Sequence, residues 1–321
     1  MSLPPPPGLF QKRVAVTGAT GFISTALLHA LHRAGAELVA IVGKGRRTAV
    51  LETLPFPVEF IEVAEVRHMG DAVREAAPAF VVHLSAHVST ERSYQSLAQT
   101  LEWNLLSTID VLTACAQIGV NRVILMGSTE EYGQNAAPFD PHLALDPPSP
   151  YAASKAAQTA YARMFHNTFG LETVILRPTV VYGPGQSPRM LISMVMEALA
   201  AGRQIDVTEG KQTRDFVYVD DVVDAILLGL VTPGLEGDVW NIGSGEVVTV
   251  RDCLERIERI TGTEGLVLYG VRPYISREIF RYESELEGTF AALNWRPAVT
   301  LDTGLQRTWE AIRRKVLAPC S

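Results

Sequence analysis

The chain contains little cysteine: only Cys115, Cys253 and Cys320 occur among 321 residues. Their number is odd and they lie far apart, so they form neither a disulfide framework nor a cluster with metal-ligand spacing. Such cysteine usage favours a reducing compartment. We therefore expect a cytoplasmic protein without a bound metal.

Long apolar runs and dense charge are also missing. No apolar run approaches the ~18 residues that span a bilayer, and the start "MSLPPPPGLFQK" lacks the apolar core of a signal peptide. Charged residues make up 20% of the chain, the net charge is −7, and no long basic run occurs. We therefore expect neither nucleic acid nor a membrane as a partner. The proline-rich residues 1–10 are expected to form a flexible tail.

Short apolar runs alternate with amphipathic stretches through the first half of the chain. The runs are "RVAVTGA", "AELVAIVG", "VEFIEV", "FVVHLSA", "RVILMGS" and "ETVILRP". They show little polar alternation, which is typical of strands covered on both faces. This order predicts βαβ units and a doubly wound parallel sheet of the α/β Rossmann class.

The alternation of apolar runs and amphipathic stretches becomes less regular after about residue 180, where Pro and Gly interrupt the chain at "YGPGQSPRM" and "VTPGLEGD". We expect a dinucleotide-binding Rossmann domain over 11–180 and 214–250. A smaller mixed α/β C-terminal lobe over 181–213 and 251–321 would then bind the substrate.

The first strand runs into "TGATGFIS", where Gly18 and Gly21 allow the backbone to approach a pyrophosphate at a helix N-terminus. After the second strand, "IVGKGRR" replaces the usual carboxylate, and Lys44, Arg46 and Arg47 suit the 2′-phosphate of NADP. The expected cofactor-binding residues are Gly18, Thr20, Gly21, Phe22, Ile23, Lys44, Glu65, Val66, Leu84, Ala86, Tyr151 and Lys155.

"SPYAASKAA" places Tyr151 and Lys155 on one face of a helix that begins near Ser149. A phenol with a reference pKa of ~10 acts as a base only when a nearby cation stabilises its phenolate. Lys155 and an oxidised nicotinamide can supply that charge. The pair can then remove a hydroxyl proton while hydride leaves the same carbon.

These motifs resemble the extended short-chain dehydrogenase/reductase family, within it the nucleotide-sugar epimerases and dehydratases. The resemblance covers nearly the whole chain and includes "VVHLSA", "LRPTVVYGPGQ", "RDFVYVDDVVDA" and "WNIGSG" in the family's order. It implies that Ser128 binds the reacting hydroxyl, that Tyr151 is its acid and base, and that Lys155 binds the nicotinamide ribose. NAD is the implied cofactor, because relatives oxidise and reduce it within one turnover; NADP is the alternative.

The resemblance also implies substrate-binding residues. Arg214 matches the family's diphosphate contact, and Arg272, Arg277 and Arg281 lie in the segment that supplies another. Val180 stands where relatives with "NVYGP" carry Asn. Ser24 replaces the family's third glycine, which would crowd the first helix against its strand.

The stretch "STEEYG" distinguishes the chemistries within the family. Epimerases tend to read Ser, Ala, Ala before this "YG", whereas dehydratases carry a Glu at the position of Glu130. Once C4 of a hexose is a ketone, the C5 hydrogen is acidic, and Glu130 is placed to remove it.

Relatives with an Asp at the position of Thr129 use that Asp as the acid for the departing C6 hydroxyl. Because this chain has Thr129 there, the motif does not identify the residue that acts as this acid. Glu130 itself, Glu131, Cys115 or a water are the alternatives, although Glu131 is expected to be a solvated loop carboxylate and Cys115 a core residue.

The expected function is therefore nucleotide-sugar dehydration, with Ser128, Thr129, Glu130, Tyr151 and Lys155 as catalytic residues. The overall resemblance favours UDP-N-acetylglucosamine as substrate and a role in antibiotic biosynthesis. The hydride would return to C4, giving a 5,6-ene, or to C6, giving a 4-keto-6-deoxy sugar. A 4-epimerase and a non-catalytic dinucleotide-binding regulator are the alternatives. The resemblance also implies a homodimer, formed by the helices that carry Tyr94, Trp103 and Tyr151.

Overall fold

The computed structural model describes residues 6–45, 49–88, 93–275 and 278–317. Its largest sheet is parallel throughout and has the strand order β10-β6-β5-β4-β1-β2-β3. These strands are β1 (Arg13–Thr17), β2 (Glu37–Gly43), β3 (Glu59–Val63), β4 (Phe80–His83), β5 (Arg122–Met126), β6 (Thr173–Pro178) and β10 (Val239–Ile242). The chain therefore has the doubly wound Rossmann sheet that its sequence predicts.

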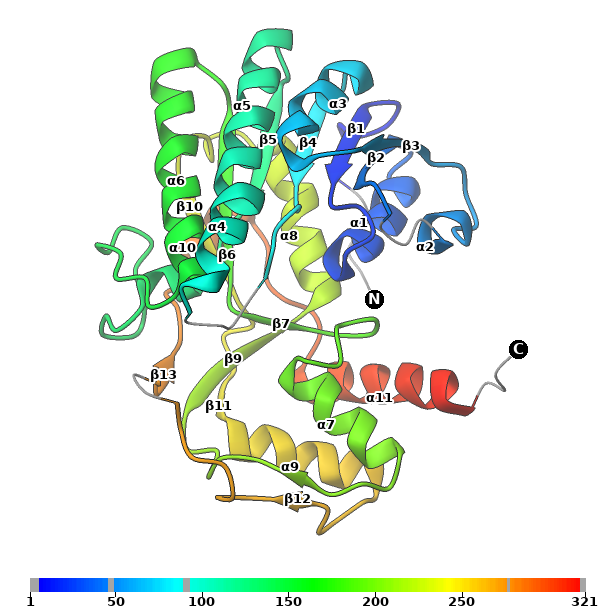
Figure 1. The fold of residues 1–321 in the computed structure, drawn as a ribbon, viewed down its shortest axis with the longest axis vertical. Helices are drawn as coiled ribbons and strands as arrows, with labels where there is room; N and C mark the ends of the chain where they lie inside the picture. The colour runs from blue at the N-terminus through cyan, green and yellow to red at the C-terminus, as the bar shows by residue number, and fades with distance from the viewer. Residues whose placement is uncertain (1–5, 46–48, 89–92, 276–277, 318–321) are drawn as a thin grey trace.

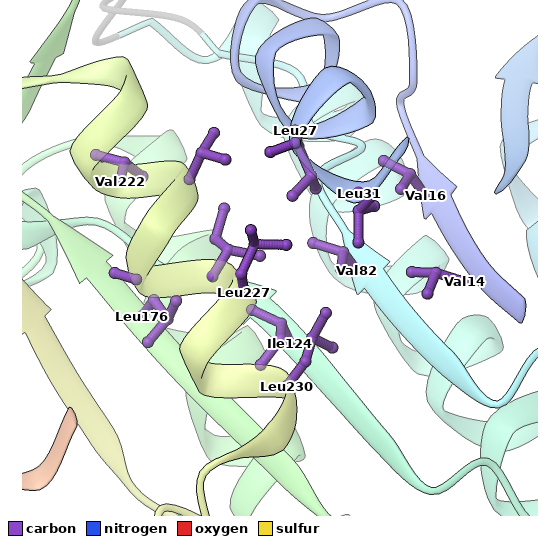
Figure 2. Packing of buried hydrophobic residues seen from close by; sticks show 14 of the residues in the cluster. Val14, Val16, Leu27, Leu31, Val82, Ile124, Leu176, Val222, Leu227 and Leu230 are labelled. Carbon is purple, nitrogen blue, oxygen red and sulfur yellow. The ribbon is translucent and has the colours of Figure 1, made fainter. Parts of the chain in front are cut away.

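Helices cover both faces of this sheet (Figure 1). One face carries α1 (Phe22–Arg33) and α8 (Val219–Val231), and the other carries α3 (Met69–Ala76), α5 (Ser107–Ile118) and α6 (Pro150–Phe169). Figure 2 shows Leu27 of α1 and Leu227 of α8 packed toward Ile124 of β5. Each such side chain contributes about 1.5–3 kcal/mol on burial, so the two helices are held firmly to the strands. Short helical segments complete this domain: α2 (Ala49–Glu52), η1 (Val66–His68), α4 (Gln95–Thr100), the π-helical turn η2 (Leu101–Leu106) and η3 (Thr129–Tyr132).

A smaller lobe lies below the main sheet in Figure 1. Its main sheet has the order β11-β9-β13, and β7 pairs with the C-terminal half of β9, residues 216–218. A separate two-stranded sheet joins β8 to β12. The strands are β7 (Val180–Tyr182), β8 (Ile205–Asp206), β9 (Thr213–Tyr218), β11 (Val247–Thr249), β12 (Val267–Leu268) and β13 (Arg281–Tyr282). The helices α7 (Leu191–Ala200), α9 (Val250–Thr261) and α11 (Leu301–Leu317) share one apolar core with them. This is the mixed α/β lobe expected from the sequence.

The boundaries between the two parts differ from the expected ones. Residue 214 lies in β9, which pairs with β7, β11 and β13 of the smaller lobe, so the chain returns to the Rossmann domain only at α8. Conversely, α10 (Glu287–Leu293) packs on the first domain, because Phe290 and Leu293 are buried in its core. Within the expected tail over residues 1–10, Leu9 is fully buried in the same core, and residues 1–5 lie outside the described part.

Candidate active site

The carboxyl ends of β1 and β4 lie side by side, at the point where the strand order reverses. Thr17 Oγ1 accepts hydrogen bonds from the backbone N–H groups of Leu84 and Ser85, both at 3.2 Å. Gly18 has φ +63°, and a Cβ there would lie 2.8 Å from the Ser85 Cα. Only glycine therefore fits this turn, which keeps the backbone at the strand ends open to a ligand.

The helix α1 begins at this turn without a side-chain cap, so its first N–H groups are available to an anion. Thr20, Gly21 and Phe22 line an adjoining cavity of about 350 Å³. Ser24, which replaces the third glycine, is buried and donates its hydroxyl proton to Gly18 O at 2.8 Å. The expected crowding is thus resolved by a hydrogen bond, and the turn fits the pyrophosphate of NAD.

The other expected cofactor residues are spread along the same edge. Leu84 and Ala86 follow β4 and are half-buried. Ile23 packs against the core under α1 and α8 and against the core of the smaller lobe. After β3, Glu65 is exposed and pairs with Arg67, whereas Val66 points into the core. Lys44 is exposed after β2, and Arg46 and Arg47 lie outside the described residues.

His83, at the end of β4, is fully buried in the core. Its Nδ1 lies 2.8 Å from Thr17 Oγ1 and its Nε2 lies 3.0 Å from Thr108 Oγ1. Thr108 donates its own proton to Asn104 O, so the imidazole must donate from Nε2 and accept at Nδ1. Burial, with the nearby charge of Lys155, lowers the pKa of His83 to about 3, so the ring is neutral.

The stretch after β5 forms a single helical turn rather than an open loop. Ser128 caps η3: its Oγ accepts from the Glu130 N–H at 3.2 Å, and its own N–H donates to Glu131 Oε1 at 2.8 Å. This reciprocal pair is a capping box, for which Ser128 and Glu131 have the required spacing. The turn directs Ser128 and Glu130 beyond the strand end.

Glu131 is fully buried, so its interpretation as a solvated loop carboxylate is wrong. Its Oε2 forms an ion pair with Arg177, 2.7 Å from Nη2, and accepts hydrogen bonds from Arg177 Nε at 3.0 Å and from Thr159 Oγ1 at 3.1 Å. Both oxygens of this carboxylate are therefore engaged within the protein, Oε1 by the Ser128 N–H and Oε2 by Arg177 and Thr159. Cys115 is buried in the core, as expected, and burial raises the pKa of its thiol to about 12.

Tyr151 lies next to this turn because α6 begins at Pro150, directly after its cap Ser149. The Tyr151 phenol lies near Ser128, and Ser149 Oγ donates to Glu130 Oε1 at 2.8 Å. The structure thus brings Ser128, Glu130 and Tyr151 together at one edge of the sheet. Ser149, which the sequence marks only as a helix start, also orients Glu130.

Electrostatics at this edge favour a protonated Tyr151 in the protein alone. Burial, followed by the negative charge of Glu130, raises the pKa of its phenol. Burial lowers the pKa of Lys155 to about 8, and its Nζ donates to Met126 O at 2.7 Å and to Gln158 Oε1 at 3.1 Å. A phenolate at Tyr151 would therefore be favoured by a further positive charge, which an oxidised nicotinamide would supply when bound.

Two of the expected substrate-binding residues lie together. Val180 and Arg214 line a cavity of about 170 Å³ in the smaller lobe. Arg214 also pairs with Glu278 at 2.5 Å and donates to Ile279 O at 2.9 Å. Arg272 is exposed, with its backbone N–H bonded to Val207 O at 3.1 Å, and Arg277 lies outside the described residues.

The structure adds a residue that sequence reasoning missed. Tyr282, in β13, lies near Ser128, Thr129 and Glu130. No spacing or motif connects it with a turn some 150 residues earlier, and the segment attracted attention only for its arginines. In the described residues, no group of three or more His, Cys, Asp and Glu is suited to a metal, and no helix has the length and apolar character to cross a membrane.

Residues 14–243 match the model of the NAD dependent epimerase/dehydratase family. The chain is 31% identical to the UDP-glucose 4-epimerase of Mycolicibacterium smegmatis over 316 residues, covering 94% of this chain and 99% of the relative. It is 29% identical to the dTDP-glucose 4,6-dehydratase of Streptomyces niveus, covering 94% and 93%. The solved structure of Thermus thermophilus UDP-glucose 4-epimerase in complex with NAD superposes with a TM-score of 0.83 at 30% identity, covering 94% and 99%.

The protein belongs to the NAD dependent epimerase/dehydratase family. The extended short-chain dehydrogenase/reductase fold and NAD as cofactor, both implied by the sequence resemblance, are confirmed. Epimerases and dehydratases of nucleotide sugars both occur among its relatives, so the family sets the class of reaction without choosing between them.

Proposed function

We propose that this chain is a nucleotide-sugar dehydratase. The observation that carries the proposal is the position of Glu130, whose carboxylate is held by Ser149 beside Ser128 and Tyr151. A 4-epimerase needs acid and base chemistry at C4 alone. A second, oriented carboxylate at the same edge suits proton removal at the neighbouring carbon.

The proposed reaction divides the chemistry among these side chains. Ser128 orients the C4 hydroxyl, and Tyr151 takes its proton and later returns a proton to that oxygen. NAD, when bound, accepts the C4 hydride and returns it at the end of the cycle. Glu130 removes the C5 proton, which the C4 ketone makes acidic, and the C6 hydroxyl then leaves as water.

We further propose UDP-N-acetylglucosamine as the substrate, with the hydride returned to C4 to give a 5,6-ene sugar nucleotide. The support is the overall sequence resemblance to the UDP-N-acetylglucosamine 5,6-dehydratase of tunicamycin biosynthesis. Arg214 would bind the diphosphate, at the cavity that Val180 also lines. Arg272 and Arg277 remain candidates for a second contact.

Substrate deuterated at C4 tests the reaction and the fate of the hydride in one experiment. The protein is incubated with this UDP-N-acetylglucosamine and NAD, and the product is analysed by mass spectrometry and proton NMR. Loss of water with deuterium retained at C4 and a new exocyclic methylene signal supports the 5,6-ene. Deuterium in a C6 methyl group instead indicates the 4-keto-6-deoxy product. If UDP-, dTDP- and GDP-sugars all fail to lose water, the dehydratase proposal is wrong.

Glu130→Gln tests the carboxylate directly, because it keeps the shape of the side chain but removes the base. We expect dehydration to fall about 10²–10⁴-fold. Glu75→Gln is the matched control, since Glu75 is an exposed carboxylate near the end of α3. An unchanged dehydration rate in Glu130→Gln would contradict the assigned role.

Epimerisation at C4 is the second candidate function. It is favoured by the similarity to UDP-glucose 4-epimerase and by Thr129, which stands where dehydratases carry an Asp. It predicts that Glu130→Gln forms the C4 epimer at the wild-type rate. A catalytically silent cofactor-binding regulator would bind NAD and show no sugar affinity, and the Tyr151 and Lys155 pair argues against it.

We also propose that the protein is a cytoplasmic homodimer. The described surface exposes Tyr94, Leu97, Leu101 and Leu106 on α4 and η2, beside Tyr161 and Met164 on α6. Both α4, which Tyr94 precedes, and η2 pack against α6, so these side chains form one apolar face of the kind that marks an interaction site. The mass measured by analytical ultracentrifugation tests the proposal.

A further inference from the structure

We propose that Tyr282 is the acid that protonates the departing C6 hydroxyl, and that Thr129 is the positioning residue that holds it. The inference deepens the proposed dehydratase function and rests on it. It answers the chemical question posed by Thr129, which occupies the place of the acidic Asp of other dehydratases.

Tyr282 reaches the site from the smaller lobe through β13. This strand pairs in parallel with β9 and places Tyr282 beside Arg214. The ring is fixed from two further sides: it packs edge-on against Phe139 at a centroid distance of 5.8 Å, and the Arg214 guanidinium lies 5.3 Å from its centroid. Phe139 in turn stacks on Tyr132 of η3 at a centroid distance of 5.0 Å, so the half-buried Tyr282 ring lies beside the turn that carries Ser128 and Thr129.

The hydrogen bonds of Thr129 indicate which partner carries the transferable proton. Thr129 is fully buried and donates its only hydroxyl proton to Pro178 O at 3.1 Å. That proton is therefore not available to a leaving group, whereas the nearby Tyr282 phenol carries one. Thr129 itself is excluded as the acid, and the proton of Tyr282 lies next to the position where relatives carry a carboxylic acid.

The surroundings of Tyr282 suit an acid. Burial, together with the nearby charge of Glu130, raises the pKa of the phenol, so that it keeps its proton at neutral pH. After proton transfer the phenolate would face the positive charge of Arg214. Glu131 and Cys115 do not compete for the role, because the first is ion-paired with Arg177 and the second lies in the core.

The elimination step is balanced with these groups. Glu130 takes the C5 proton, and the electrons of that C–H bond form the C5–C6 double bond. The C6–O bond breaks, and the leaving oxygen takes the proton of Tyr282 and departs as water. The proton on Glu130 then returns to the Tyr282 phenolate, so both side chains are restored when the hydride is returned to C4.

Tyr282→Phe is the decisive variant, since it removes the proton and keeps the ring. Water loss from UDP-N-acetylglucosamine should fall about 10²–10⁴-fold. C4 oxidation, seen as reduced nicotinamide absorbance, and C5 hydrogen exchange in deuterium oxide should persist. The variant should also release fluoride from the 6-deoxy-6-fluoro analogue within a few-fold of wild type, because fluoride leaves without an acid. Thr129→Val should slow water loss, and Thr129→Ser should recover most of the rate.

Tyr274→Phe is the matched control, because Tyr274 belongs to the same segment but contacts the backbone of Lys211. The inference is overturned if Tyr282→Phe keeps its rate of water loss, or if it loses C5 exchange and fluoride release to the same extent, which would indicate a structural role. A wild-type protein that dehydrates no nucleotide sugar refutes the proposed function first, and this inference with it.

Discussion

The buried ion pair between Glu131 and Arg177 provides the sharpest stability test. Both side chains are essentially inaccessible, at 0% and 2% exposure, and Glu131 Oε2 lies 2.7 Å from Arg177 Nη2 and accepts a hydrogen bond from Arg177 Nε. Removing one partner of such a pair leaves an uncompensated buried charge, which costs about 3–5 kcal/mol. We therefore expect Arg177→Met and Glu131→Gln each to lose this much of the free energy of unfolding.

The double variant Glu131→Gln/Arg177→Met leaves no buried charge at the site. The double variant should lose about as much free energy of unfolding as one single variant. Its loss should therefore be about 3 kcal/mol smaller than the sum of the two single losses. Glu131→Gln keeps an amide oxygen for the Ser128 N–H.

Urea unfolding at neutral pH, followed by circular dichroism, measures all three variants. Arg163→Met is the control, because Arg163 and Asp238 form a pair at 2.7 Å in which both side chains are 39% exposed. Its cost should be about 0–1 kcal/mol. If Arg177→Met costs no more than this control, or if the two single effects simply add, the reasoning about the buried pair is refuted.

Three further predictions follow from single features. Gly18→Ala should weaken NAD binding at least about tenfold, because φ +63° and the contact with Ser85 both exclude a Cβ. Calorimetry measures this, and Gly119→Ala, which has φ +73° and open space, should leave the affinity unchanged. His83 has a lowered pKa, so the unfolded chain binds its proton first and stability falls as pH drops from 6.5 toward 3. Between pH 7 and 5, wild type should lose about 2 kcal/mol more than His83→Asn in urea unfolding, and equal losses would contradict the assignment. Leu97→Glu should yield a monomer in the ultracentrifuge, whereas Phe60→Glu, a similarly exposed apolar residue on β3, should remain dimeric; a dimeric Leu97→Glu would argue against the α4 and η2 interface.

Much of the fold follows from local sequence. Unalternated apolar strands and intervening helices predict the parallel sheet, because strands covered on both faces must be apolar throughout. The turn at Gly18 is equally local, since the residues that need special backbone angles and the helix that follows are contiguous. Tyr151 and Lys155 form a recognisable pair because one helix places both on the same face.

The sequence alone thus determined the sheet, the phosphate turn and the group of Ser128, Glu130 and Tyr151 as candidates. Tertiary structure decided the rest, because it depends on contacts between residues far apart in the chain. Packing against Arg177 turned Glu131 from an expected surface carboxylate into a buried ion, while adjacent Glu130 kept its place at the strand end. The pairing of β13 with β9 brought Tyr282 to Thr129, a meeting that no local pattern encodes.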